Sequence, residues 1–360
     1  MTKLEKSLKY ILTPMSWLYG SAVALRNKMF DYGLLKEISF DIPVVGVGNI
    51  TVGGTGKTPH VEYILECLRY KRNIAVLSRG YKRKTKGFIL ATSKSTPESI
   101  GDEPLQIYEK FGGNVKVAVC ESRVKGVREL IREFPKLDLI VLDDSFQHRY
   151  IKPKVNIMLM DYTHPVYTDN ILPLGRMRES TGAVDRADFV ITTKCPPNIS
   201  ALDMRIVSKH LNLMPYQKLY FSTYDYGGLI PVFPDDCPYR VLLENLTSED
   251  TVLLLTGVAN PRPFVNHFRQ YPFRRRVLYF SDHHDFSKAD LAEIQAKYRA
   301  NTGKRKIIVT TEKDAVRLSH NPYFPHDLKP FIFYIPIGVR MLESNFGYDF
   351  IPDLLHAINK

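Results

Sequence analysis

The stretch GVGNITVGGTGKTP at residues 46–59 decides the fold of this 360-residue chain. An apolar run rich in valine, Val44–Ile50, overlaps its start and predicts a buried strand, and His60–Tyr70 has the periodicity of a helix. The glycines between them, Gly53, Gly54 and Gly56, let the backbone curl until successive N–H groups converge, as in a phosphate-binding loop. We therefore predict a nucleotide-binding site between this strand and this helix.

The residues of the loop have separate expected roles. Lys57 is expected to reach the β- and γ-phosphates, and the Thr58 hydroxyl is expected to hold Mg²⁺. Thr51 stands where the usual motif, G-x-x-x-x-G-K-[ST], has its first glycine, so the match is to the core GGTGKT. The predicted nucleotide contacts are Thr51, Gly53, Gly54, Thr55, Gly56, Lys57 and Thr58.

A second predicted strand supplies the acidic partner that such a loop needs. The apolar run Leu139–Asp143 ends in a carboxylate, and Asp144 follows directly. One carboxylate holds Mg²⁺ through water, and the other is free for a second metal contact or for orienting a substrate. Asp143 and Asp144 are therefore the predicted metal-linked carboxylates, with the alternative that they only form a turn.

Strand-like runs alternate with helical patterns along the chain, which predicts an α/β fold. We expect a P-loop NTPase-type, mostly parallel sheet with helices on both faces, followed by a smaller C-terminal α/β domain. The Pro- and Gly-containing stretch Tyr224–Pro238 is the best candidate for a hinge. The predicted division is an N-terminal helix at 1–30, a nucleotide-binding core at 31–220, a linker at 221–238 and the smaller domain at 239–360.

Composition excludes several classes of protein. With 44% hydrophobic and 24% charged residues, the chain is neither disordered nor collagen-like nor a coiled coil. Its four cysteines are far apart and form no CxxC or Cys/His cluster, which argues against a zinc site or a disulfide scaffold and favours a reducing compartment.

Positive charge is concentrated at the start of the chain. The formal net charge is +12, and residues 1–100 hold 16 Lys and Arg against 7 Asp and Glu. Such clustering indicates an anionic partner, namely nucleic acid, an anionic membrane surface or a phosphorylated substrate, although a solubilising surface is the alternative.

The N-terminal segment suits a membrane surface. Met15–Leu25 is an uncharged run flanked by Lys and Arg, and it carries the single Trp of the chain. Eleven residues are too few for a helix that crosses a bilayer, which needs about 20. With no small-x-small cleavage site after the run, we predict no cleaved signal peptide. A helix lying in the membrane interface, with Pro14 as a kink or a second start, and a helix packed on the protein's own core both remain open.

Further clusters follow other predicted strands. Ser78–Tyr81 and the Lys/Arg residues after it offer anion-binding side chains. Asp102 opens a predicted helix, where a carboxylate is favoured by the helix dipole and is often only a cap. Asp282–Phe286 places two His beside two Asp, for which a His–carboxylate pair is a better interpretation than a metal site.

Together these motifs resemble the tetraacyldisaccharide 4'-kinase family, the lipid A 4'-kinases. The resemblance runs from the N-terminal helix to about Leu318, and the string GNITVGGTGKTP is far more specific than a generic P-loop. Ser145 departs from the glycine that the family usually has after the Asp pair. The other motifs, in chain order, are SRGY at 78–81, GDEP at 101–104, DDSFQHR at 143–149, PLGRMRE at 173–179, DHH at 282–284 and TEKDA at 311–315.

The resemblance implies an activity and a location. Such enzymes move the γ-phosphate of ATP, with Mg²⁺, to the 4'-hydroxyl of a tetraacyldisaccharide 1-phosphate and give lipid IVA. They are peripheral proteins on the cytoplasmic face of the bacterial inner membrane, and their site lies in the cleft between the two domains. The expected partners are thus the acylated disaccharide 1-phosphate and an anionic membrane surface, without nucleic acid or an obligatory protein partner.

The resemblance also assigns residues by motif position. Asp102 resembles the catalytic base, assisted by His283, and Lys57 completes the catalytic set. Because Asp102 and His283 lie in different halves of the chain, closure of the domains is expected to assemble the base. The residues that fall where the family keeps other active-site groups are Arg79, Arg123, Gln147, His148, Arg178 and Glu179.

Two other functions are compatible with parts of the sequence. GGTGKT also occurs in switch ATPases for protein targeting, partitioning or metal delivery, but their deviant loop has Lys directly before the glycine pair, where this chain has Val52. A nucleic-acid-binding NTPase rests on net charge alone. The kinase is therefore the favoured prediction.

Overall fold

The predicted phosphate-binding loop leaves the carboxyl end of the central strand of a nine-stranded sheet. The computed structural model describes residues 3–344 and 346–360. The strand order is β14-β8-β7-β6-β1-β5-β2-β4-β3, with every pair parallel except those of the edge strands β3 and β14. The strands are β1 (Val44–Gly48), β2 (Ile74–Ser78), β3 (Ile89–Leu90), β4 (Val115–Val119), β5 (Leu139–Asp143), β6 (Val155–Asp161), β7 (Phe189–Thr193), β8 (Lys218–Tyr226) and β14 (Ile337–Leu342).

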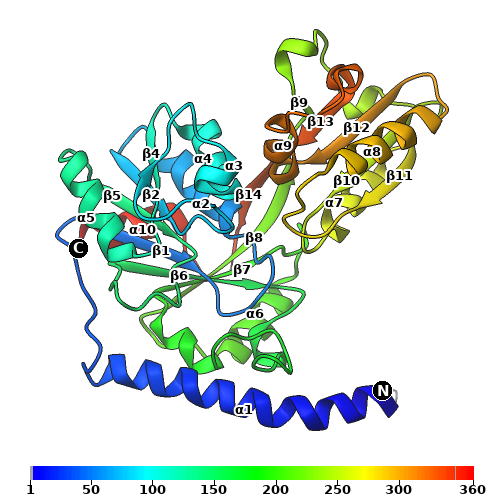
Figure 1. The fold of residues 1–360 in the computed structure, drawn as a ribbon. Coiled ribbons are helices and arrows are strands. Elements are labelled where there is room, and N and C mark those ends of the chain that lie inside the picture. Colours follow the sequence, from blue (N-terminus) through cyan, green and yellow to red (C-terminus); the bar gives the residue numbers. More distant parts are fainter. Residues whose placement is uncertain (1–2, 345) are drawn as a thin grey trace.

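Helices cover both faces of this larger sheet, because its inner strands are apolar on both sides and need cover on each. On one face α2, α4 and α10 pack in a common core, and on the other face α5 and α6 contribute to two further cores. The predicted α/β architecture is therefore confirmed (Figure 1). The helices of this part are α1 (Lys3–Asp31), α2 (Lys57–Leu68), α3 (Pro97–Ile100), α4 (Asp102–Phe111), α5 (Arg123–Glu133), α6 (Ala201–Leu211) and α10 (Phe350–Asn359).

A smaller five-stranded sheet has the order β11-β10-β12-β13-β9. Only the β13–β9 pair is antiparallel. Helices α8 and α9 cover one face, and α7 covers the other. The elements are β9 (Ile230–Pro231), β10 (Thr251–Thr256), α7 (Arg262–His267), β11 (Arg274–Tyr279), α8 (Lys288–Ala300), β12 (Lys306–Thr311), α9 (Glu312–Ser319) and β13 (Ile332–Ile335). The six short 3₁₀ helices of the described chain are Val166–Thr168, Thr181–Arg186, Pro234–Asp236, Leu243–Asn245, Phe268–Gln270 and His326–Phe331.

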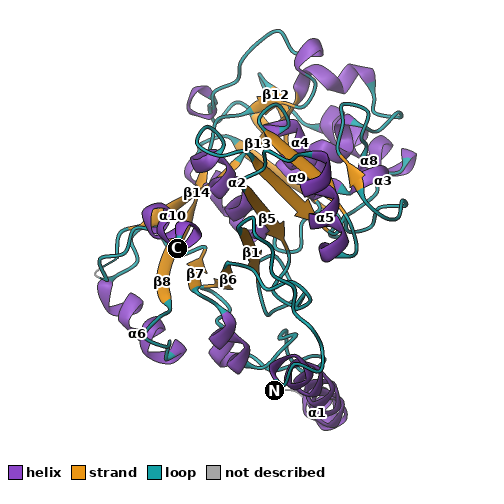
Figure 2. Ribbon diagram, turned by 90° about the vertical axis from the view of Figure 1, so that its left-hand side faces the viewer, coloured by secondary structure: helices purple, strands orange, loops and turns teal. Residues whose placement is uncertain are grey.

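The chain returns to the larger sheet after the smaller one, which corrects the predicted boundaries. β14 pairs antiparallel with β8, from Ile337 opposite Tyr226 to Leu342 opposite Phe221. Helix α10 then buries its apolar residues against the larger sheet (Figure 2). The predicted smaller domain at 239–360 therefore divides between the two sheets, and the predicted linker at 221–238 begins inside β8. This pairing joins segments more than a hundred residues apart, so local sequence pattern carries no signal of it.

Two short connections link the sheets at one place. The chain crosses between β8 and β9 through residues 227–229, and it crosses back between β13 and β14 at Pro336. The N–H of Gly227 donates to the carbonyl of Pro336 at 3.0 Å, so the two crossings lie side by side.

We call the nine-stranded sheet with its helices the larger unit, and the five-stranded sheet with its helices the smaller unit. Helix α1 lies along the base of the larger unit as a long helix with Pro14 inside it (Figure 1). Its predicted counterpart at 1–30 includes residues 1 and 2, which lie outside the described residues. Arg149 anchors its C-terminal end by ion pairs to Asp31 and Glu37, and the guanidinium stacks over Phe30. The outward side carries apolar residues that remain exposed, including Tyr10, Ile11, Trp17 and Leu18. None of the described helices is both long and apolar enough to cross a bilayer.

A buried histidine fixes the first turn of α2 to strand β8. Nδ1 of His60 lies 2.7 Å from the carbonyl oxygen of Gly56, and Nε2 lies 2.8 Å from the Ser222 hydroxyl. The neutral ring satisfies both contacts by donating from Nδ1 and accepting at Nε2. Burial lowers the pKa of His60 from 6.5 to about 4, and nearby Lys194 adds to the lowering against the opposing hydrogen bond to Gly56.

This histidine should make folding sensitive to acid. The unfolded chain takes up a proton on His60 as pH falls through 6.5, whereas the folded chain resists it down to about pH 4. Stability is therefore lost across that window, by about 3 kcal/mol at most. Between about pH 7 and pH 4.5, the free energy of unfolding should fall in both proteins. We expect the fall to be about 2–3 kcal/mol smaller in His60→Asn than in the parent. Denaturant unfolding at several pH values measures this.

The exposed His356 provides the matched control, because His356→Asn should leave the pH dependence of unfolding unchanged. An identical pH dependence in the parent and in His60→Asn would contradict the role given to His60.

Candidate active site

Side chains bind three consecutive carbonyl oxygens of the phosphate-binding loop. The Thr193 hydroxyl donates to the carbonyl of Thr55 at 2.9 Å, and His60 contacts the next carbonyl, that of Gly56. Lys194 Nζ donates to the carbonyl of Gly54. Because the C=O and N–H of a trans peptide point in opposite directions, the N–H groups of Gly56 and Lys57 are turned to the other side. The loop is thus built to present N–H groups to an anion.

Positive backbone φ angles explain why glycine occupies two positions of the loop. Gly53 and Gly56 have φ of 103° and 89°, a region that glycine adopts without strain. Thr51, in contrast, pairs in extended fashion with Met177, and the N–H of Val52 donates to the carbonyl of Arg176 at 2.8 Å. A glycine is therefore not required at position 51, and the departure from the usual motif follows from this pairing.

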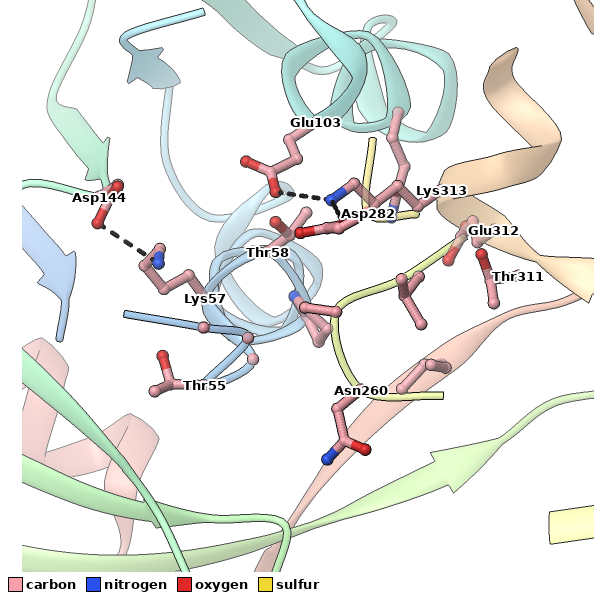
Figure 3. A pocket seen from close by; sticks show the side chains of 18 of the residues that line it. Thr55, Lys57, Thr58, Glu103, Asp144, Asn260, Asp282, Thr311, Glu312 and Lys313 are labelled. Carbon is pink, nitrogen blue, oxygen red and sulfur yellow. Dashed lines mark hydrogen bonds and ion pairs between the residues drawn. The ribbon is translucent and has the colours of Figure 1, made fainter. Parts of the chain in front are cut away.

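The loop opens into a cavity of about 600 Å³ between the two sheets. Figure 3 shows Lys57 and Asp144 on one side of it and Glu312 and Lys313 on the other. Of the predicted nucleotide contacts, Gly53, Gly54, Thr55, Gly56, Lys57 and Thr58 line this cavity. Thr51 instead lines an adjoining cavity of about 840 Å³, to which the loop residues up to Thr55 also contribute.

Strand register brings the predicted carboxylates to the loop. Val47 of β1 lies beside Asp143, the last residue of β5, so Asp143 and the following Asp144 lie where the loop begins. Asp144 Oδ1 lies 3.5 Å from Lys57 Nζ and 3.7 Å from Arg178 Nη1. Both carboxylates line the 600 Å³ cavity.

The buried carboxylate of Asp143 fits a bound cation. Its Oδ1 is buried and has no hydrogen-bond partner in the part of the chain that the structure describes. Burial, together with the nearby charges of Glu103 and Asp144, raises the pKa of Asp143 to about 7. A divalent cation supplies the missing positive charge and a ligand for that oxygen, and Thr58 lines the same cavity. Oxygen donors from one or two side chains suit Mg²⁺, which keeps waters and phosphates as its other ligands.

Asp102 and His283 meet across the gap between the sheets. Nδ1 of His283 lies 2.9 Å from Oδ2 of Asp102, although the two residues are 181 positions apart. Asp102 is the first residue of α4, placed there by Gly101, whose φ of 93° sharply separates α3 from α4. His283 lines the cavity, whereas Asp102 lies buried behind it. The predicted histidine–carboxylate pair is therefore formed.

Lys313 fixes the other end of the His283 ring. Its Nζ lies 2.9 Å from Nε2 of His283, 3.2 Å from Asp282 and 3.7 Å from Glu103. A lysine ammonium only donates, so Nε2 accepts and Nδ1 carries the proton given to Asp102. The hydrogen-bond network thereby assigns the tautomer of His283.

The six supporting residues predicted by motif position come together beside Asp144. They line a third cavity, of about 270 Å³, together with Tyr19, Val23 and Arg26 of α1. Burial lowers the pKa of His148 to about 4, and the charges of the surrounding arginines contribute to the shift. The six are Arg79, Arg123, Gln147, His148, Arg178 and Glu179.

Hydrogen bonds hold these residues in place. Arg123 is buried and donates to the carbonyls of Cys120 and Asp143 at 2.9 and 3.1 Å. Gln147 receives a hydrogen bond from Arg178 at 3.2 Å, and Glu179 accepts one from Asn27 of α1 at 2.7 Å. The cavity is thus cationic, and α1 forms one of its walls.

Several residues of the site escaped the sequence analysis. Thr193 ends strand β7, Lys194 follows it, and both bind carbonyls of the loop. Asn260 lines both larger cavities. Arg317 of α9 contacts Asp102 directly. A usable signal existed for Arg317, because it follows Lys313 by one helical turn and therefore lies on the same face of α9.

Comparison with known proteins identifies the family. A family model described as tetraacyldisaccharide-1-P 4'-kinase matches residues 8–354 and so extends well beyond Leu318, where the recognisable motifs end. A tetraacyldisaccharide 4'-kinase from Bacteroides thetaiotaomicron is 47% identical over 340 residues, covering 92% of this chain and 89% of its own. Another from Porphyromonas gingivalis is 43% identical over 337 residues, covering 92% of each chain.

A solved structure agrees with this result. The crystal structure described as the "apo" form of LpxK from Aquifex aeolicus in complex with ATP superposes with a TM-score of 0.72 at 25% sequence identity. The superposition covers 99% of both chains. On the sequence match and the shared fold, the chain belongs to the tetraacyldisaccharide-1-P 4'-kinase family.

Proposed function

We propose that this protein transfers the γ-phosphate of ATP to the 4'-hydroxyl of a tetraacyldisaccharide 1-phosphate and so forms lipid IVA, a step of lipid A biosynthesis. The observation that carries the proposal is that one cavity is lined both by a phosphate-binding loop and by a histidine paired with a buried carboxylate. Family membership supplies the substrate class. A switch ATPase is no longer favoured, because the relatives are kinases.

Phosphoryl transfer depends mainly on positioning and on neutralising charge. In our proposal, Lys57 and the N–H groups of the loop bind the β- and γ-phosphates of ATP. Thr58, Asp143 and Asp144 hold Mg²⁺, which neutralises phosphate charge when it is bound. The orphaned Oδ1 of Asp143 and its raised pKa support this assignment.

The Asp102–His283 pair is proposed to accept the proton of the 4'-hydroxyl. Asp102 is the base of the pair, as the family motif implies, and His283 orients it and shares the proton. The two groups share a hydrogen bond of 2.9 Å. The proton leaves the hydroxyl late in the transfer, when the new O–P bond is already forming.

The cationic cavity beside α1 is proposed to receive the polar head of the acceptor. It adjoins the nucleotide cavity through Asp144 and Arg178, which line both. Its arginines suit an acceptor that carries phosphate, because guanidinium groups bind phosphate oxygens in pairs. With α1 as one wall, the acyl chains would lie along the apolar outward side of that helix.

We further propose that the protein is a peripheral protein of the cytoplasmic face of the bacterial inner membrane. The support is the row of exposed apolar side chains on α1 together with the excess of Lys and Arg in the first 100 residues. An amphipathic surface of this kind binds anionic lipid through buried apolar area and charge attraction.

A direct transfer assay tests the function. With γ-labelled ATP, Mg²⁺ and detergent-dispersed tetraacyldisaccharide 1-phosphate, we expect label in a lipid product whose new phosphate is on the 4'-oxygen. Chelation of Mg²⁺ should abolish the transfer. Label that appears only as free phosphate, at a rate independent of the acceptor, would contradict the proposal.

Replacing the proposed base should impair turnover without impairing ATP binding. We expect Asp102→Asn to lower kcat by about 10²–10⁴-fold, since the pair loses its negative charge. Titration with a fluorescent ATP analogue should show nearly the same affinity for the variant. The exposed Asp327, which pairs only at the surface, gives the matched control Asp327→Asn with parental kcat. Parental turnover in Asp102→Asn would refute the assignment.

Tryptophan fluorescence can measure membrane binding, because Trp17 is the single tryptophan and is 74% exposed on α1. We expect its emission to shift to shorter wavelength with vesicles that contain anionic phospholipid, and less with zwitterionic vesicles. High salt should weaken the binding. Unchanged emission with both kinds of vesicle would contradict the membrane proposal and leave the transfer reaction untouched.

A further inference from the structure

Helices α4 and α9 face each other across the gap between the two sheets. Helix α4 belongs to the larger unit and begins with Asp102, and α9 belongs to the smaller unit. Oppositely charged side chains meet along this contact. The ion pairs are Asp102–Arg317 at 2.5 Å, Lys110–Glu312 at 3.3 Å and Glu103–Lys313 at 3.7 Å, and the His320 ring lies 3.7 Å from Glu109.

The pair between Arg317 and Asp102 differs from the others in being buried. The side chain of Arg317 is 8% exposed and that of Asp102 is 3% exposed. Nη2 of Arg317 donates to Oδ2 of Asp102, and Nη1 donates to Asp285 at 3.1 Å. Asp285 is 98% exposed, so solvent weakens its hold on the guanidinium. The strong, desolvated interaction of Arg317 is therefore the one with Asp102.

The same carboxylate oxygen receives two donors from the smaller unit. Oδ2 of Asp102 accepts from Nδ1 of His283 at 2.9 Å and from Nη2 of Arg317 at 2.5 Å. Burial acts to raise the pKa of Asp102, but these two hydrogen bonds and the charge of Arg317 outweigh it and leave the pKa below its ordinary value.

Other charges surround the pair on all sides. From the smaller unit, Lys313 contacts His283, while Asp282 lies 4.0 Å from the ring and Asp285 contacts Arg317. From the larger unit, Lys82 donates to the backbone carbonyl of His283 at 3.3 Å, and the Tyr81 ring packs on the imidazole. Glu103 reaches Lys313. Within this set Arg317 is the cation that touches Asp102 itself.

We propose that Arg317 is a positioning residue for the phosphoryl transfer, holding Oδ2 of Asp102 from the smaller unit so that the carboxylate stays anionic and faces His283. The inference rests on the proposed function and adds a residue to it. Arg317 acts through Asp102 and does not line the nucleotide cavity. Since Arg317 and His283 both belong to the smaller unit, both donors to this carboxylate come from across the gap between the sheets.

Three variants separate charge, hydrogen bonding and packing at this position. Arg317→Lys keeps the charge, Arg317→Gln keeps an N–H donor without charge, and Arg317→Met keeps only the length. Removing the cation raises the pKa of Asp102, so the carboxylate becomes protonated at higher pH. In the Gln and Met variants, kcat/KM should therefore begin to fall at a pH about one unit higher than in the parent. At any pH below that point, kcat/KM should be about tenfold lower than in the parent. Turnover should approach the parental value on the alkaline side, and Arg317→Lys should keep the parental pH profile.

The matched control is Arg299→Met, because Arg299 is 65% exposed and pairs at the surface with Asp327. Its pH profile should be parental. If Arg317→Met does not fold, as judged by its thermal transition, the Gln variant decides. A loss of kcat/KM that is equal at all pH values, or a fall that begins at the same pH as in the parent, would overturn the inference.

A second measurement separates this inference from the function itself. In protein with ¹³C-labelled aspartate and without substrates, the Asp102 carboxyl signal, identified by its loss in Asp102→Asn, should titrate at higher pH in Arg317→Gln than in the parent. If Asp102 titrates at higher pH in Arg317→Gln but the parent does not phosphorylate the lipid, the proposed function is refuted and the role of Arg317 in holding Asp102 stands. An unshifted titration in an active enzyme would refute the role of Arg317 alone.

Discussion

A phosphate-binding loop works only if its carbonyl oxygens are kept away from the anion, and this requirement organises the larger sheet. Three consecutive carbonyls, those of residues 54–56, are bound by the side chains of Lys194, Thr193 and His60. These donors come from the end of β7 and from α2, and His60 is in turn fixed to β8. The loop therefore depends on strands that are distant in sequence, and its shape is set before any phosphate arrives.

The smaller unit contributes chemistry that the larger one lacks. The loop, the Asp143–Asp144 carboxylates and the cationic cavity all belong to the larger unit, whereas His283, Lys313 and Arg317 belong to the smaller one. Ion pairs join α4 and α9, and Val316 of α9 is also buried in the same core as Leu105 and Ile107 of α4. The two units are thus held together by apolar packing as well as by charge, at the place where Asp102 meets His283.

The sequence allowed good prediction wherever the signal was local. The loop follows a buried strand and precedes a helix, and Asp143 ends the next predicted strand, so elementary rules place them together. Family motifs added Asp102 and His283, which the structure brings to 2.9 Å. The return of β14 to β8 had no local signal, because its pairing depends on a partner about 115 positions away. Arg317 shares a face of α9 with Lys313, but this spacing alone does not identify Asp102, which lies on another helix, as its buried partner.

The paired crossings at Gly227 and Pro336 have a consequence for how the molecule is put together. The whole smaller unit is an insertion between two neighbouring antiparallel strands, since β8 ends opposite the start of β14. Excising residues 227–336 and joining Tyr226 to Ile337 through a tight turn would convert this junction into a β-hairpin. The larger sheet is therefore a continuous architecture in its own right, and the segment that carries His283, Lys313 and Arg317 is inserted between two strands at its edge, while their partner Asp102 stays on α4.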